Sequence, residues 1–101
     1  MISRQWRGLA RSEHAQAYVE HLQHETFPAL RKLPGFKGAS ILRRRVNDGV
    51  EFLIVTEWES VDAIRAFAGA NAEAAVVPDN VHAMMIEYDR VVRHYEVVDR
   101  Q

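Results

Sequence analysis

The chain has 101 residues and no cysteine, and its 13 Lys and Arg residues nearly balance 14 Asp and Glu residues, for a formal net charge of −1. This length predicts one domain over residues 1–101, with one modest core and no room for a separate cofactor domain. The near-zero charge gives no general attraction to nucleic acid or to an anionic membrane, and the lack of cysteine excludes disulfides, thiolate metal sites and cysteine nucleophiles.

Signals for export or membrane insertion are missing from the sequence. The N-terminus MISRQWRG carries Arg4 and Arg7 and no apolar run of signal-peptide length. No run elsewhere approaches the roughly 20 apolar residues that span a bilayer as a helix. We therefore expect a soluble, cytoplasmic protein that does not associate with membranes.

The first third of the chain predicts a strand followed by a long helix. Ile2 to Gly8, with Trp6 at its centre, predicts the strand. Ser12 is the expected N-cap of an amphipathic helix that runs to Leu33 and bends at Pro28, where one backbone donor is missing. The apolar residues on one side of this helix are Ala15, Tyr18, Val19, Leu22, Ala29, Leu30 and Leu33.

A β-hairpin is predicted next. Pro34-Gly35 stops the helix, and Phe36 to Val46 predicts the second strand. Asn47-Asp48-Gly49 signals a tight turn, and Val50 begins the third strand. Within that strand, Phe52 to Thr56 is an apolar, β-branched run typical of a strand covered on both faces.

The last part of the chain predicts two further helices and a final strand. Ser60 is the expected N-cap of a helix that ends at Gly69, and residues 71–77 are ambiguous. Pro78 to Tyr88 predicts a short helix, and Val91 to Val98 predicts the last strand. The apolar side of the first of these helices is Val61, Ile64, Phe67 and Ala68, and that of the second is Val81, Met84, Met85 and Tyr88.

This order of elements matches the ferredoxin-like split β-α-β unit, an α+β fold with a four-stranded antiparallel sheet and helices on one face. In its third strand Phe52 and Ile54 point one way while Leu53 and Val55 point the other. Both faces of the sheet are therefore apolar, although helices cover one of them. We predict a symmetric homodimer in which the open sheet faces pack together.

Four stretches resemble the antibiotic biosynthesis monooxygenase (ABM) family of dimeric α+β barrels. They are EFLIVTEWESVDAIRAFAG from Glu51 to Gly69, the PGF turn after the first helix, the hairpin turn and the terminal VRHYEVV. The resemblance covers nearly the whole chain. The family includes oxygenases that need no flavin or metal, haem-degrading enzymes and members with no assigned activity.

The haem-degrading branch of the family resembles this chain at the Trp-x-Ser join but not at its functional positions. The position of its catalytic tryptophan corresponds to Phe67 in this chain, and that of its haem-ligating histidine to about Val77. The position of its first-strand asparagine lies near Gln5 or Trp6. All three residue types differ here. The resemblance therefore disfavours haem degradation.

The leading hypothesis, by resemblance, is a cofactor-independent monooxygenase acting on a small aromatic molecule of phenolic, quinol or anthrone-like type. Such chemistry requires an apolar pocket, here expected between sheet and helices, with a base and with donors that stabilise an oxyanion. The alternatives are a non-catalytic small-molecule-binding or stress-associated domain of the same fold, and a cofactor-free isomerase or decarboxylase. We expect no flavin, haem or metal cofactor.

Polar-tipped side chains in apolar surroundings are the candidate site residues. His94 is the candidate base, because it shares strand parity with Val92 and can point into a packed layer. Trp58 and Trp6 are candidate catalytic donors through their indole N–H groups, although both also suit a packing role. The candidate substrate-binding residues are Tyr18, Phe67, Met84, Tyr88 and Arg44.

The cluster His21, His24 and Glu25 has side chains that bind metals. His21 and Glu25 stand one helical turn apart, but His24 falls opposite the core stripe and no third strong ligand is near. We therefore predict a solvated helix face and no metal site.

The run Arg43-Arg44-Arg45 is predicted to lie on a strand. Alternation sends Arg44 to the face opposite its neighbours, so the run is not one basic surface. We expect a salt bridge across the hairpin to Glu51 or Glu57, with contact between Arg44 and a substrate anion as the alternative.

Overall fold

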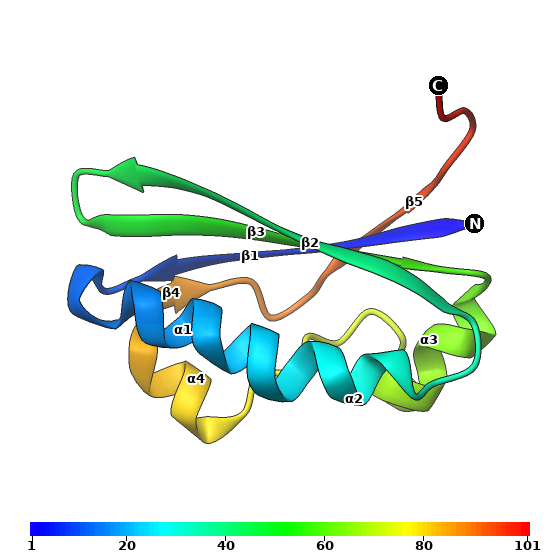
Figure 1. Cartoon of the computed structure of the whole chain (residues 1–101), viewed down its shortest axis with the longest axis horizontal. Coiled ribbons are helices and arrows are strands. Elements are labelled where there is room, and N and C mark those ends of the chain that lie inside the picture. The colour runs from blue at the N-terminus through cyan, green and yellow to red at the C-terminus, as the bar shows by residue number, and fades with distance from the viewer.

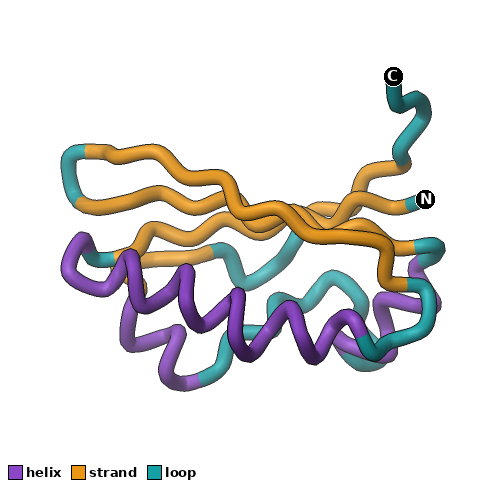
Figure 2. The backbone as a smooth tube through the Cα atoms, in the orientation of Figure 1, coloured by secondary structure: helices purple, strands orange, loops and turns teal.

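The computed structural model describes residues 1–101 and shows two layers, a twisted antiparallel sheet and a layer of helices against one of its faces (Figures 1 and 2). The strands are β1 (Ile2–Ala10), β2 (Phe36–Val46), β3 (Gly49–Trp58), β4 (Met85–Tyr88) and β5 (Arg93–Glu96). The α-helices are α1 (Ala15–His21), α2 (Phe27–Arg31), α3 (Val61–Ala68) and α4 (Asp79–Met84). The strand order β2-β3-β1-β4 confirms the predicted ferredoxin-like α+β fold. None of the helices is long and apolar enough to cross a bilayer.

The predicted long first helix forms, but with a change of geometry near its middle. A 3-10 turn (Ser12–His14) precedes α1, and a π-helical turn (Leu22–Thr26) joins α1 to α2. A π turn contains an extra residue, which accommodates the missing N–H of Pro28 and rotates every later side chain. Phe27 is consequently buried, whereas Ala29, which was expected on the core side, is exposed. The prediction of Ser12 as N-cap is wrong, since Arg11 occupies that position.

The predicted hairpin and the following join are confirmed. β2 and β3 pair antiparallel from Phe36 opposite Trp58 to the turn. The Ser60 hydroxyl accepts a hydrogen bond from the backbone N–H of Ala63 at 3.2 Å and caps α3. Gly69 ends the helix with φ of 85°, a left-handed conformation that glycine adopts without steric cost.

The edge of the sheet beside β1 differs from the prediction, because two short strands share it. The chain leaves α4 at Met84 and continues as β4, so the predicted helix through Tyr88 is wrong in its last four residues. β4 pairs with the end of β1 near Ala10, and β5 pairs with residues 2–5. Between them the Trp6 indole N–H donates to the carbonyl of Asp89 at 2.8 Å. The Trp6 side chain thus provides a hydrogen bond to the backbone in the gap between β4 and β5.

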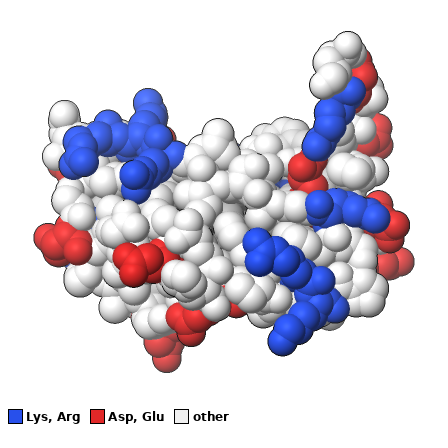
Figure 3. Space-filling view, viewed as in Figure 1, with Lys and Arg blue, Asp and Glu red and all other residues white.

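Alternate residues of the central strands form the core, as predicted. The β3 residues that face the helices and are buried are Val50, Phe52, Ile54, Thr56 and Trp58. On the other face Leu53 and Val55 are half-buried, and Leu42 and Tyr95 are 48% and 50% exposed. No helix covers this open face (Figure 1). Charges of both signs are interspersed on the side of the molecule in Figure 3, with Lys and Arg gathered over the hairpin end of β2 and β3.

Candidate functional site

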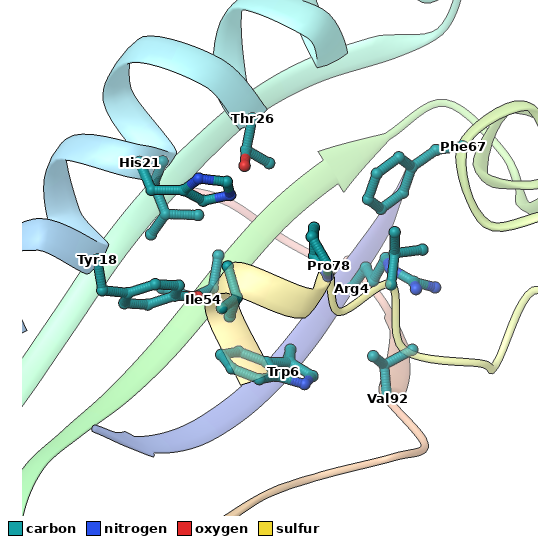
Figure 4. Close-up of a pocket in the computed structure, with 12 residues that line it drawn as sticks. Arg4, Trp6, Tyr18, His21, Thr26, Ile54, Phe67, Pro78 and Val92 are labelled. Atoms are coloured by element: carbon teal, nitrogen blue, oxygen red, sulfur yellow. The ribbon is translucent and has the colours of Figure 1, made fainter. Parts of the chain in front are cut away.

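A cavity lies between the sheet and the helices. Its walls come from β1 and β3, from α1 and the π turn, from α3 and α4, and from the loop around Pro78 (Figure 4). The cavity has a volume of about 70 Å³, which is several times the volume that one water molecule requires. The lining residues are Arg4, Trp6, Tyr18, His21, Leu22, Thr26, Ile54, Phe67, Val76, Pro78, Val81 and Val92.

The polar groups of this mostly apolar cavity lie toward its two ends. Figure 4 shows Tyr18 and His21 on one side and Arg4 beneath Phe67 on the other, with apolar side chains between them. Apolar walls with a few placed polar groups are the usual composition of a small-molecule site. The arrangement suits a mostly apolar ligand with polar atoms at opposite ends.

Arg4 is a buried cation without an acidic partner. Its residue is 4% exposed. Nη1 donates to the carbonyl of Ala72 and contacts Nε2 of His94 at 3.0 Å, while Nη2 donates to the carbonyl of Ala74 at 2.8 Å. Its Cζ atom lies 5.7 Å from the centroid of the Phe67 ring. Carbonyls, an imidazole and an aromatic face therefore solvate the guanidinium, and no carboxylate neutralises it.

This environment makes Arg4 a strong site for an anion. Burial lowers the pKa of Arg4 to about 10, so the side chain still carries its charge at neutral pH. Attraction between charges is stronger in a low-dielectric cavity than in water. Of the five guanidinium N–H groups, three are used by the contacts above, which leaves two for a ligand.

His94, the predicted base, lies beside Arg4 and not in the cavity wall. It is opposite Arg4 in the β1–β5 ladder. Burial first, and then the positive charge of Arg4, lower the pKa of His94, although Glu73 opposes the shift. Neutral His94 can accept a hydrogen bond from Arg4 through Nε2, so its position suits holding the guanidinium in place.

The lowered pKa of His94 predicts a loss of stability in mild acid. In the unfolded chain the histidine pKa is near 6.5, so His94 binds a proton more tightly there than in the folded protein. The contribution of neutral His94 to folding stability is therefore fully present above about pH 6.5, and it is lost as the pH falls through the lower pKa of the folded protein. We expect the midpoint of thermal unfolding to fall between about pH 7 and pH 5, and His94→Asn to reduce this dependence. Circular dichroism melts of both proteins measure it. An identical pH dependence in the variant would contradict the assignment.

The two predicted catalytic tryptophans use their indole N–H groups inside the protein. Trp58 is fully buried, is absent from the cavity wall and donates to the hydroxyl of Thr56 at 2.9 Å. It stacks on Phe67 with ring centroids 6.1 Å apart. Trp6 does line the cavity, but its N–H is bonded to Asp89. Both indoles therefore pack, and neither offers a donor to a ligand.

Tyr18 reaches the cavity as predicted and carries a free hydroxyl. The residue is 3% exposed and its ring packs edge-on against Phe52 at 5.0 Å. The hydroxyl makes no hydrogen bond within the protein and is not sealed from the cavity. Burial raises the pKa of Tyr18, so the phenol stays protonated and can donate.

Tyr18→Phe is expected to leave the free energy of unfolding unchanged to within about 0.5 kcal/mol, because no hydrogen bond of the protein is lost. Affinity for a phenolic ligand is expected to fall by roughly threefold to tenfold, through loss of one hydrogen bond to the ligand. Urea unfolding and calorimetric titration measure the two effects. Tyr95→Phe, on the open face of the sheet, is the matched control, and an equal loss of affinity there would contradict the role of Tyr18.

Three other predicted substrate-binding residues lie outside the cavity wall, whereas Phe67 is part of it. The Tyr88 hydroxyl is 2.7 Å from Nδ1 of His82. The Met84 carbonyl accepts from the backbone N–H of Arg11 at 2.9 Å. Arg44 lies on a strand with Nε 2.6 Å from a carboxylate oxygen of Glu51, which is the salt bridge predicted from alternation.

The sequence carried signals for two cavity residues that were not singled out. Arg4 has the same strand parity as Trp6, which places a cation on the core side of β1. The predicted solvated helix face is wrong for His21, which lines the cavity with a side chain that is 9% exposed. Its Nδ1 is 2.9 Å from a carboxylate oxygen of Glu25. No three His, Asp or Glu side chains are grouped closely enough to hold a metal ion.

Comparisons with known proteins agree with this fold. The family model described as antibiotic biosynthesis monooxygenase matches residues 1–78. No curated protein sequence matches the chain. Several solved structures share the fold at identities that support a conclusion about fold alone.

Three of these structures come from Streptomyces and Mycobacterium proteins. A mutant of SnoaB, a cofactor-independent oxygenase from Streptomyces nogalater, is 16% identical with a TM-score of 0.67 over 98% of this chain and 94% of that chain. The haem-degrader MhuD from Mycobacterium tuberculosis, with two haems bound, is 22% identical with a TM-score of 0.63 over 100% and 99%. The monooxygenase ActVA-Orf6 of Streptomyces coelicolor, in complex with nanaomycin D, is 18% identical with a TM-score of 0.61 over 99% and 88%.

Proposed function

The chain belongs to the antibiotic biosynthesis monooxygenase family, and on that premise we propose that it is a cofactor-independent monooxygenase of a small phenolic, quinol or anthrone-like molecule. The observation that carries the proposal is the apolar cavity with a buried, uncompensated Arg4 in its wall. The apolar walls fit an aromatic ring, and Arg4 fits an oxygen that becomes negative during the reaction. The similar fold of a cofactor-independent oxygenase supports the proposal.

The chemistry requires little from the protein. An electron-rich ring that loses a proton acquires carbanion character and reacts with O₂. For an anthrone, the two hydrogens of the ring methylene leave as water with one oxygen atom, and the other oxygen atom becomes a carbonyl, so no further reductant is needed. The protein must supply a base, stabilise the oxyanion and exclude water.

Oxygen consumption tests the proposal directly. Protein stripped of metal and flavin is expected to consume O₂ with a panel of anthrones and hydroquinones faster than the uncatalysed reaction. Arg4→Gln is expected to lower the rate, while Arg43→Gln, an exposed arginine on β2, is expected to leave it unchanged. Uptake no faster than in buffer would overturn the proposal.

A non-catalytic ligand-binding role is the second candidate. The observation that favours it is that the indoles of Trp6 and Trp58, two of the predicted catalytic groups, are engaged within the protein. Binding without O₂ uptake would select this role, and rearrangement of the ligand without O₂ would select an isomerase or decarboxylase. A Soret shift on titration with haem would revive the haem interpretation, which Phe67 and Val77 disfavour.

We also propose that a second copy of the chain covers the open face of the sheet. That face carries Leu42, Leu53, Val55 and Tyr95 with no helix over them. A stable interface buries on the order of 800 Å² per partner. The pairing is isologous, since both copies use the same surface.

Light scattering checks the dimer. The wild-type protein is expected to be dimeric at micromolar concentration, and Leu53→Glu is expected to be monomeric, because it places a charge in the apolar contact. Ala66→Glu on the exposed side of α3 is the control and is expected to stay dimeric. A wild-type protein that remains monomeric under these conditions would contradict the proposal.

A further inference from the structure

We propose that the cavity ionises its aromatic ligand: His21, aligned by Glu25, removes a proton at one end, and Arg4 holds the oxyanion that forms at the other. The ligand class is a weakly acidic aromatic whose acidic hydrogen and conjugated oxygen lie on opposite sides of the ring system. The proposal rests on the function proposed above and assigns residues within the same cavity.

His21 is placed and oriented as a base. It is the last residue of α1, its side chain is 9% exposed, and Figure 4 shows its ring directed toward the interior of the cavity. A carboxylate can only accept a hydrogen bond, so the 2.9 Å contact with Glu25 places the ring proton on Nδ1. Nε2 is then left with a lone pair and makes no hydrogen bond to the protein. The amide of Asn80 is farther from Nδ1, at 3.4 Å.

Glu25 is a positioning residue in this arrangement. Its side chain is 69% exposed, so its hydrogen bond to His21 contributes little to folding. What the carboxylate supplies is the tautomer and orientation of the imidazole, and a counter-charge once His21 has accepted a proton. The π turn that contains Glu25 also brings Leu22 and Thr26 to the cavity wall.

Arg4 completes the ionisation from the opposite end of the cavity. When His21 takes the proton from a C–H or O–H bond, the electron pair of that bond stays on the ligand and is delocalised through the ring to the conjugated oxygen. That oxygen is negative where it meets the guanidinium. Arg4 and His21 are the only basic side chains in the wall and no acidic side chain lines it, so the wall favours a monoanion.

The charged groups around both residues are consistent with these roles. Arg4 faces His94 and two backbone carbonyls, and none of these carries a negative charge. Glu73, whose charge acts on His94, is exposed and forms no salt bridge with Arg4. His21 faces Glu25 and the neutral Asn80. The negative charge available to the base therefore lies at its own end, and the unpaired positive charge lies at the oxyanion end.

Hydrogen exchange without oxygen separates ionisation from oxygenation. The wild-type protein, incubated with anthrone in D₂O under nitrogen, is expected to accelerate deuterium incorporation at the ring methylene, followed by mass spectrometry. His21→Gln and Arg4→Gln are each expected to slow the catalysed exchange by about 100-fold or more. The solvent-facing His24→Gln and Arg43→Gln are matched controls and are expected to retain the wild-type rate.

Each outcome distinguishes this proposal from the oxygenase function. Exchange without O₂ uptake supports the ionisation site and removes the oxygenase function. If His21→Gln consumes O₂ as fast as the wild type, the assignment of His21 as the base is overturned, while the oxygenase function stands. Wild-type protein that does not accelerate exchange overturns the proposal.

Two further measurements separate these roles from a structural effect. Arg4→Lys, which keeps the charge, is expected to retain part of the exchange rate that Arg4→Gln loses, with the fold of both checked by circular dichroism. In Glu25→Ala, nitrogen-15 NMR of His21 is expected to show a reduced population of the Nδ1–H tautomer. An unchanged tautomer population together with slower exchange would overturn the role of Glu25.

Discussion

Truncation of Trp58 to alanine is expected to lower the free energy of unfolding by about 3 to 5 kcal/mol. Trp58 is fully buried where β2, β3 and α3 meet, with the ring of Phe36 edge-on at 5.2 Å and that of Phe67 stacked at 6.1 Å. The substitution leaves a large cavity and removes the donor to Thr56. Because domains of this size are stable by about 5 to 15 kcal/mol, the loss is a large part of the total.

Urea unfolding measures the change in free energy, and thermal unfolding measures the change in midpoint temperature, which is expected to fall by roughly 15 to 30 °C. Trp58→Phe is the control, since it keeps most of the buried ring and loses only the N–H. It is expected to cost much less stability and to retain O₂ uptake. A stable Trp58→Ala protein without activity would contradict the packing role and restore the catalytic one.

The parts of the fold that were predictable from sequence are those set by local chemistry. The join from β3 to α3 combines a change of hydrophobic period, a serine cap at Ser60 and a left-handed Gly69, and all three signals act within a few residues. The hairpin turn is similarly local. Agreement between neighbouring signals is what made these boundaries correct.

The errors fall where a distant segment decides the local structure. Residues 85–88 have a helical apolar pattern, yet they pair with the end of β1 and form β4. Tertiary pairing therefore overrides a weak local preference. The wrong face predicted for Ala29 in the first helix has a different source. A π turn before Pro28 shifts the helical register by one residue, and an apolar pattern with a period of 3.6 residues does not reveal such a turn.

Strand parity predicted which face a candidate residue occupies but not its depth beneath the cavity. His94 and Trp58 both point to the helical side of the sheet, yet Arg4 and Phe67 stand between them and the ligand space. Arg4 was not among the candidate site residues, and arginine is rarely buried. Its core-facing position on β1, shared with Trp6, is the sequence signal that points to this site.

Replacing Arg4 with methionine is expected to separate function from stability. Burial lowers the pKa of Arg4 to about 10, which corresponds to an unfavourable free energy on the order of 3 kcal/mol for keeping the charge inside the fold. Methionine relieves this cost and fills similar space, whereas the carbonyls of Ala72 and Ala74 lose a donor at about 1 to 3 kcal/mol each. We therefore expect a net change in stability within about 2 kcal/mol of zero.

Affinity for an anionic aromatic probe is expected to respond very differently. Binding of 4-nitrophenolate is expected to weaken by at least about 30-fold in Arg4→Met, because the bound anion loses its one buried counter-charge. Arg7→Met is the control, since Arg7 is paired with Glu51 at 2.7 Å and lies outside the cavity wall. A residue retained only for packing would lose stability and affinity together. A folded Arg4→Met protein that binds the probe as tightly as the wild type would show that the buried charge serves the fold and not the ligand.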